Sequence, residues 1–307
     1  MTSGDGAGRA AENPAVFRDY DQAGLDAQLN LRARWPDHQR FFDRWARDSE
    51  ATRSRLDARL DARLDIAYGA APAETLDLFP AAGGGPAPLL AFIHGGYWQA
   101  LDKSDYSYLA PAFLEAGAAY ASLNYGLAPE TSIGTMIAQI RRAFAWLYRE
   151  AGRYGIDRDR IVVAGHSAGG HLTAMALATD WPALDSDLPA AFPAGGCSIS
   201  GVYDLLPIRL SYQNAVLGIP ADETAAWSPL SNLPKTAPPL IVAVGSEETD
   251  EFLRQHGEFA AAWRDRGLPL HDVPLPGRHH FDAVDALGEP GHPLCVAVQQ
   301  MLAGQLS

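Results

Sequence analysis

Residues 160–170 read Arg-Ile-Val-Val-Ala-Gly-His-Ser-Ala-Gly-Gly. The apolar run at 161–164 predicts a buried strand, and residues 171–177 (His-Leu-Thr-Ala-Met-Ala-Leu) predict a helix. Between them, Gly-His-Ser-Ala-Gly fits the G-x-S-x-G pattern, in which small residues allow a sharp turn that lifts the serine hydroxyl above a sheet. The helix start behind the turn favours negative charge. This strand, turn and helix predict that Ser167 is a nucleophile.

A second glycine-bearing segment lies upstream of the serine. Residues 88–93 (Pro-Leu-Leu-Ala-Phe-Ile) predict a buried strand that ends in His-Gly-Gly-Tyr-Trp at 94–98. Acyl transfer requires two backbone N–H groups aimed at the developing oxyanion. One comes from the residue after the nucleophile and the other from a glycine-rich loop after an earlier strand. We therefore predict an oxyanion hole formed by Ala168 together with Gly95 or Gly96.

A serine nucleophile needs a base, and the base needs an orienting carboxylate, in the chain order serine, acid, histidine. Residues 268–275 predict the last core strand, and His279 and His280 follow where that strand ends. The strand predicted at 239–244 is followed by Gly-Ser-Glu-Glu-Thr-Asp-Glu at 245–251. Spacing alone leaves both histidines open, and it does not separate Glu248 from Asp250.

Taken together, these segments resemble an α/β-hydrolase of the kynurenine formamidase (arylformamidase) type, which is grouped with related bacterial esterases. The resemblance covers about residues 20–287. It implies that the catalytic histidine directly precedes a phenylalanine, which selects His280, and that the acid lies four residues before Phe252, which selects Glu248. Several members carry aspartate at the acid position, so Asp250 remains an alternative. The matching motifs are H-G-G-x-W at 94–98, Gly-His-Ser-Ala-Gly-Gly at 165–170, Asn-Tyr-Gly-Leu-Ala-Pro-Glu at 124–130 and Pro-Gly-Arg-His-His-Phe at 276–281.

The composition agrees with a single α/β domain that has additional elements. The chain has 307 residues, and its 47% hydrophobic content supplies a large core. A net charge of −13 disfavours nucleic acid and anionic membranes as partners. Two cysteines, Cys197 and Cys295, indicate no disulfide framework and favour a cytoplasmic location. We expect no secretory signal at the start of the chain and no membrane span, because no apolar run is long enough.

Along the chain we expect a disordered tail (1–15), an N-terminal helical cap segment (16–54) and a catalytic domain (55–307). The cap segment is amphipathic, with Phe41, Phe42 and Trp45 on one helical face, and we expect it to cover the carboxyl ends of the strands and wall the pocket. A tetrapeptide repeat follows at 55–66. Its second half predicts an edge strand paired with 74–79, its first half stays undecided, and Gly-Gly-Gly at 83–85 predicts a hairpin loop.

Further strands are predicted at 119–124 and 195–200, with an amphipathic crossover helix at 137–151. Strands that alternate with helices indicate a mostly parallel sheet with helices on both faces. This order agrees with the α/β-hydrolase fold that the resemblance implies.

The sequence contains no metal-ligand pattern and no cofactor motif, so we expect neither group. Tyr97, Trp98 and Tyr203 are candidates for binding an acyl or aryl group, as is Trp227, although each also suits a packed core. The expected function is that of a serine hydrolase acting on a small ester or aryl formamide such as N-formylkynurenine. A general short-chain carboxylesterase and a non-catalytic binding protein on the same fold are the alternatives. The physiological substrate, and whether the chain forms a homodimer, stay open.

Overall fold

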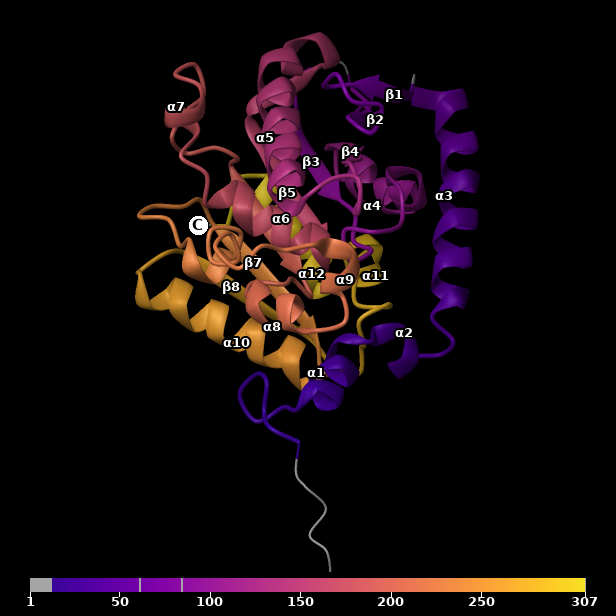
Figure 1. Ribbon diagram of the computed structural model, residues 1–307. Coiled ribbons are helices and arrows are strands. Elements are labelled where there is room, and N and C mark those ends of the chain that lie inside the picture. Colours follow the sequence, from indigo (N-terminus) through magenta and orange to yellow (C-terminus); the bar gives the residue numbers. More distant parts are fainter. Residues whose placement is uncertain (1–12, 61, 84, 307) are drawn as a thin grey trace, which may run out of the picture.

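The computed structural model describes residues 13–60, 62–83 and 85–306, and the side chains of 57–60 are not described. Its centre is an eight-stranded sheet in the order β1-β2-β4-β3-β5-β6-β7-β8 (Figure 1). The strands from β3 to β8 pair in parallel, whereas β2 runs antiparallel to both of its neighbours. The mostly parallel sheet predicted from the sequence is therefore confirmed. The strands are β1 (Arg63–Ala67), β2 (Thr75–Phe79), β3 (Ala87–Ile93), β4 (Ala119–Leu123), β5 (Ile156–His166), β6 (Gly195–Ile199), β7 (Leu240–Gly245) and β8 (Leu270–Leu275).

The central strands are mostly apolar because helices cover both faces of the sheet. Every residue of β4 and β6 is buried, and so is all of β3 except one residue. Strands buried on two faces read as continuous hydrophobic runs, which is why the sequence located them well. The edge strand β1 is exposed at four of its five residues, Leu64 among them, so its alternation of charged and apolar residues is not matched by alternating burial.

In Figure 1, helices α5 and α6 lie in front of the strands and the yellow helix α12 lies behind them. Both α6 and α12 pack against β3, β5 and β6, so the core has three layers. Helix α10 packs against β7 and β8. The helices beyond the N-terminal segment are η1 (Lys103–Leu109), α4 (Ala110–Glu115), α5 (Ile133–Glu150), η2 (Ala151–Tyr154), α6 (Ala168–Leu177), α7 (Trp181–Leu184), α8 (Leu205–Leu210), α9 (Asn214–Leu217), η3 (Pro229–Ser231), α10 (Asp250–Asp265), α11 (Asp285–Gly288) and α12 (Pro293–Leu302).

The N-terminal segment folds as α1 (Gln22–Leu29), α2 (Leu31–Arg34) and the long helix α3 (Gln39–Leu60). In Figure 1, α3 runs along one side of the molecule, where it packs against η1. The carboxylate of Asp285 holds it there, accepting hydrogen bonds from Arg44 and from Trp45 Nε1 at 2.5 and 3.2 Å. The helix continues past residue 54, where the cap segment was expected to end. Most of the expected disordered tail, residues 1–12, lies outside the described residues.

The tetrapeptide repeat divides between two conformations. Residues 55–60 belong to α3, which decides the half that the sequence left open, and the second half forms β1, paired with β2 as predicted. The hairpin loop predicted at 83–85 is wrong. Strands β2 and β3 flank that segment in the chain but are not neighbours in the sheet, because β4 lies between them. Chain order alone does not reveal which strand enters between two others.

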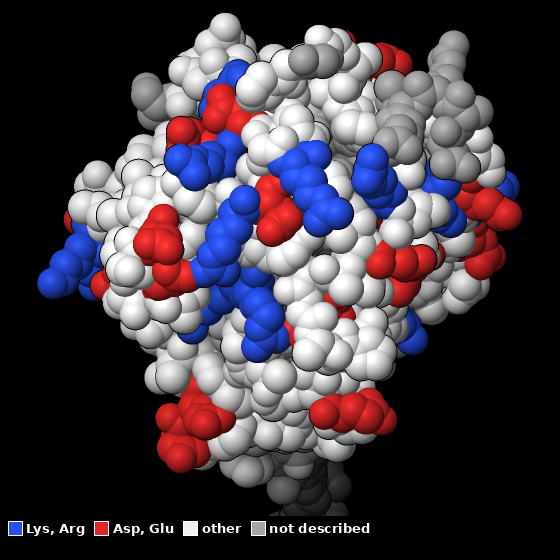
Figure 2. Space-filling model, turned by 90° about the horizontal axis from the view of Figure 1, so that it is seen from above, with Lys and Arg blue, Asp and Glu red and all other residues white. Residues whose placement is uncertain are grey.

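Charged side chains of both signs alternate over the face shown in Figure 2, so the net charge of −13 is not gathered into one patch on that face. Many acidic groups there have a basic neighbour. In the described molecule as a whole, the ion pairs include Arg149–Asp185 and Arg142–Glu74. Arg254 pairs with three carboxylates.

Candidate active site

Ser167 occupies a strained turn between β5 and α6, with φ +57° and ψ −118°. Positive φ is costly for a serine and is retained where the surroundings enforce it. Two glycines make the turn feasible. A Cβ on Gly165 would overlap the carbonyl oxygen of Gly169, and a Cβ on Gly169 would overlap that of Ile93. The G-x-S-x-G pattern is therefore a packing requirement that holds Ser167 at the carboxyl edge of the sheet, where it lines a cavity.

Three side chains from three different strand ends form a hydrogen-bonded chain. His280 Nε2 lies 3.0 Å from Ser167 Oγ, and His280 Nδ1 lies 2.8 Å from Glu248 Oε2. All three residues are buried. The second oxygen of Glu248 accepts a hydrogen bond from the hydroxyl of Ser200, a residue with φ +49° that directly follows β6. A hydroxyl, an imidazole and a carboxylate are thus connected in the order that acyl transfer requires of a nucleophile, a base and an orienting group.

The two alternatives from the sequence are placed elsewhere. His279 stacks on Trp35 with ring centroids 5.0 Å apart, and its Nδ1 accepts a hydrogen bond from the N–H of Phe281. Asp250 is exposed and is the first residue of α10. His280 therefore contacts the serine and Glu248 contacts His280, whereas neither His279 nor Asp250 joins this chain of hydrogen bonds.

Two neighbouring side chains contact His280, one at its imidazole and one at its backbone. Phe252 meets it edge-on with ring centroids 4.7 Å apart, and His166 Nε2 lies 2.9 Å from the His280 carbonyl oxygen. Burial, together with the nearby His280, lowers the pKa of His166 well below 6.5. A neutral His166 can donate from Nε2 to that carbonyl, so it holds the backbone of His280 in place.

The loop after β3 has three consecutive residues with positive φ: Gly96 at +103°, Tyr97 at +53° and Trp98 at +58°. A Cβ on Gly95 would come within 3.1 Å of Ser167 Cβ, which shows how closely this backbone approaches the serine. Within the described residues, the backbone N–H groups of Gly96 and Ala168 have no hydrogen-bond acceptor. Free donors beside a serine hydroxyl are what an oxyanion hole needs.

A cavity of about 390 Å³ opens onto Ser167 and His280. The sequence-predicted Tyr97 and Gly96 line it, and Tyr97 Oη donates to the Leu29 carbonyl at 2.9 Å, which ties the loop to the N-terminal segment. Burial raises the pKa of Tyr97 well above 10, so its hydroxyl stays protonated. The remaining lining residues are Asn30, Leu31, Arg32, Phe42, Trp45, Gln99, Ala100, Leu101, Tyr106, His166, Tyr212, Gln213 and Phe281.

The N-terminal segment therefore supplies part of the cavity wall. The sequence pointed to Phe42 and Trp45 through their shared helical face, but it gave no signal for Arg32 or Gln213. Phe281 directly follows His280, and the sequence marked it only as part of a motif. Leu101, which has φ +73°, was not recognised either. These residues come from separated segments, and their convergence is a property of the tertiary fold.

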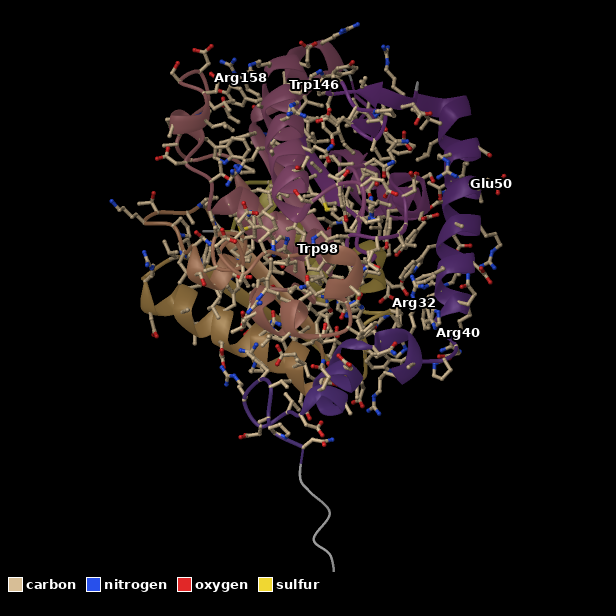
Figure 3. All side chains as sticks on the ribbon, in the orientation of Figure 1. Arg32, Arg40, Glu50, Trp98, Trp146 and Arg158 are labelled. Atoms are coloured by element: carbon tan, nitrogen blue, oxygen red, sulfur yellow. The ribbon has the colours of Figure 1, made fainter. Side chains whose placement is uncertain are left out.

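The structure does not place Trp98 and Tyr203 in the cavity. Both are completely buried. Trp98 lies in the interior (Figure 3) and meets His171 edge-on at 5.2 Å. Tyr203 stacks on Phe259 at 4.0 Å and shares a hydrogen bond with Ser198. Trp227, which packs beside Gly134, is not a lining residue either. Large aromatics near a motif also serve the core, and the sequence cannot tell the two roles apart.

In the described part of the chain, no group of three or more histidine, cysteine or carboxylate side chains is arranged to hold a metal ion. Over the same residues, no helix combines the length and apolarity needed to cross a bilayer.

Comparisons with known proteins place this geometry among hydrolases. The BD-FAE family model matches residues 76–256. Kynurenine formamidase of Danio rerio is 30% identical over 243 residues, which cover 77% of this chain and 80% of that protein. Esterase LipQ of Mycobacterium tuberculosis is 32% identical over 224 residues, covering 67% of this chain and 52% of that protein. A solved structure from Silicibacter sp., described as a candidate thioesterase, is 34% identical with a TM-score of 0.76, covering 89% of this chain and 97% of that one.

Proposed function

The chain belongs to the BD-FAE family of α/β-hydrolases and is a hydrolase, and we propose that it cleaves aryl formamides through a serine nucleophile. The observation that carries this proposal is the chain of hydrogen bonds from Ser167 through His280 to Glu248, which opens into a cavity with aromatic walls. The kynurenine formamidase relatives support the formamide as substrate, and the aromatic residues suit a flat ring.

In this mechanism the Ser167 hydroxyl attacks the carbonyl carbon while its proton passes to His280 Nε2. Glu248 stabilises the imidazolium and fixes the ring orientation, with one oxygen held by Ser200. The N–H groups of Ala168 and of Gly95 or Gly96 stabilise the oxyanion. The imidazolium then gives its proton to the leaving amine, and water cleaves the acyl-enzyme with His280 again as the base.

We also propose that the N-terminal helical segment acts as a cap over a catalytic domain that starts near residue 55. The contacts of Phe42, Trp45 and Leu31 with the cavity support this division. A cap that limits access of bulk water protects an acyl-enzyme from uncontrolled side reactions and shapes substrate choice.

A general short-chain carboxylesterase is the second candidate, because an esterase relative is 32% identical. The deciding experiment compares kcat/KM for N-formylkynurenine with kcat/KM for p-nitrophenyl acetate. A higher value for the formamide supports the first function, and a higher value for the ester supports the second. Ser167→Ala is the control, and we expect it to lose about 10⁴-fold in kcat on either substrate. Wild-type protein that hydrolyses neither compound would contradict both.

A further inference from the structure

One formally charged side chain lines the cavity. Among the lining residues, which otherwise are apolar, aromatic, amide, hydroxyl or histidine side chains, Arg32 alone carries a charge at neutral pH. It belongs to the short helix α2 and is exposed to solvent. Figure 3 shows Arg32 beside the end of α3 from which Arg40 also projects. A guanidinium at the cavity rim gives a site in an acidic protein a local positive charge.

Arg32 has no carboxylate partner within 4.0 Å among the described residues. Its guanidinium carbon lies 5.7 Å from the centre of the Phe42 ring, a cation–π contact that leaves the N–H donors free. Asp26, on the preceding helix, is engaged elsewhere, because its Oδ1 accepts from the backbone of Tyr212 at 2.9 Å and from Gln22 at 3.0 Å. An unpaired arginine at a cavity is available to a ligand.

Two glutamines and a tyrosine add polar groups to the cavity lining. Gln99 Nε2 donates to Gln213 Oε1 at 2.9 Å, and Gln213 Nε2 donates to Tyr212 Oη at 3.0 Å. Aromatic side chains line other parts of the cavity. One of them is Tyr106, which is completely buried and whose hydroxyl has no partner among the described residues. The cavity thus combines aromatic surface, an unpaired buried hydroxyl and one free guanidinium.

We propose that Arg32 binds a carboxylate on the substrate, so that the enzyme prefers aryl formamides or aryl esters whose ring bears an anionic group. The guanidinium presents parallel N–H donors that match the two oxygens of a carboxylate. Phe42 beneath it restricts the side chain and reduces the entropy lost on binding. This inference rests on the proposed function for its reaction, but the anion site itself can be tested without turnover.

The kinetic test uses two substrates that differ in charge and hardly in shape, 3-acetoxybenzoate and 3-acetoxybenzamide. We expect Arg32→Gln to lower kcat/KM for the carboxylate about 10-fold relative to the carboxamide, since a charge-assisted hydrogen bond is lost from a partly solvated site. Arg32→Lys should retain part of the preference. The effect of Arg32→Gln should shrink between 0.02 and 0.5 M salt, as a screened interaction does.

Arg34→Gln is the matched control. Arg34 lies on the same helix, is exposed, and has its guanidinium carbon 5.9 Å from the Trp35 ring, but it does not line the cavity. We expect this variant to leave the ratio of the two kcat/KM values unchanged. Equal changes on both substrates in Arg32→Gln, or the same change in Arg34→Gln, would overturn the proposal.

Calorimetry with 3-methoxybenzoate and 3-methoxybenzamide, which cannot be hydrolysed, separates this inference from the proposed function. Tighter binding of the carboxylate by the wild-type protein, lost in Arg32→Gln, supports the anion site even if neither ester is cleaved. The opposite result would be that both esters are cleaved and that Arg32→Gln changes neither the binding of the two ligands nor the two kcat/KM values. This result would refute the anion site and leave the hydrolase function intact.

Discussion

The two adjacent histidines at the end of β8 offer a test at the scale of single residues. His280 contacts both Ser167 and Glu248, whereas His279 packs on Trp35 outside the cavity. His280→Ala should reduce kcat about as much as Ser167→Ala, by about 10⁴-fold or more, because the members of a triad act as a unit. His279→Ala should cost far less. Steady-state kinetics on both purified variants give the ranking, and the reverse order would move the base to His279.

The acid is tested in the same way. Glu248→Gln removes the charge that stabilises the imidazolium and should lower kcat by about 10²- to 10⁴-fold with the fold intact. Asp250→Asn should have a milder effect. This exposed carboxylate is the first residue of α10, where its charge interacts favourably with the helix dipole. Circular dichroism checks the fold of each variant. A larger loss of kcat in Asp250→Asn would transfer the orienting role to that residue.

At the scale of elements, a buried histidine on α6 couples stability to pH. His171 Nε2 lies 2.7 Å from the Trp227 carbonyl, and burial lowers the pKa of His171 to about 4. Below pH 6.5 the unfolded chain binds a proton that the folded chain rejects, so stability falls as the pH drops from about 6.5 to about 4. By linkage, this one group lowers the free energy of unfolding by about 3 kcal/mol as the pH falls across that window.

Urea unfolding at pH 7 and at pH 4.5 measures that loss. His171→Gln keeps a group able to hydrogen-bond to the Trp227 carbonyl but cannot titrate, so its stability should change less between the two pH values than that of the wild-type protein. Buried His94 and His166 also have lowered pKa values and remain in both proteins, so the difference isolates His171. Identical pH dependence in the two proteins would show that His171 does not titrate in this way.

The buried strands and the turn that carries Ser167 could be predicted, because the residues that determine them lie close together in the sequence. The turn at Ser167 needs glycines at fixed offsets, and the buried strand β3 is a continuous apolar run. Other features depend on residues far away in the sequence. These are the burial of Trp98 and Tyr203 in the core and the position of β4 between β2 and β3 in the sheet. Spacing could not choose between Glu248 and Asp250, and only the family resemblance selected the residue that contacts the base.

At the scale of the whole molecule, the N-terminal segment joins distant parts of the chain. Arg18 forms an ion pair with Glu258, and Arg44 forms one with Asp285. The carbonyl oxygen of Leu29 accepts a hydrogen bond from the Tyr97 hydroxyl. Removing residues 1–50 should uncover buried apolar surface, lower solubility, and weaken the preference between formamide and ester. Measuring solubility and the ratio of the two kcat/KM values tests this. A soluble truncated protein with an unchanged ratio would show that the segment takes no part in the site.

The repeat at 55–66 has a consequence for how the length of this chain can vary. Nearly the same four residues are helical at the end of α3 and extended in β1, so position relative to the sheet, and not the local sequence, sets the conformation. The extended copy is anchored at Asp65, which has φ +55° and binds Lys103 Nζ at 2.7 Å. Each unit has an aspartate in the equivalent place. Loss or gain of one unit would therefore still leave an aspartate in this place, and α3 would shorten or lengthen by about one turn. A change in the number of units would thus alter the span of the helix while the sheet kept its register.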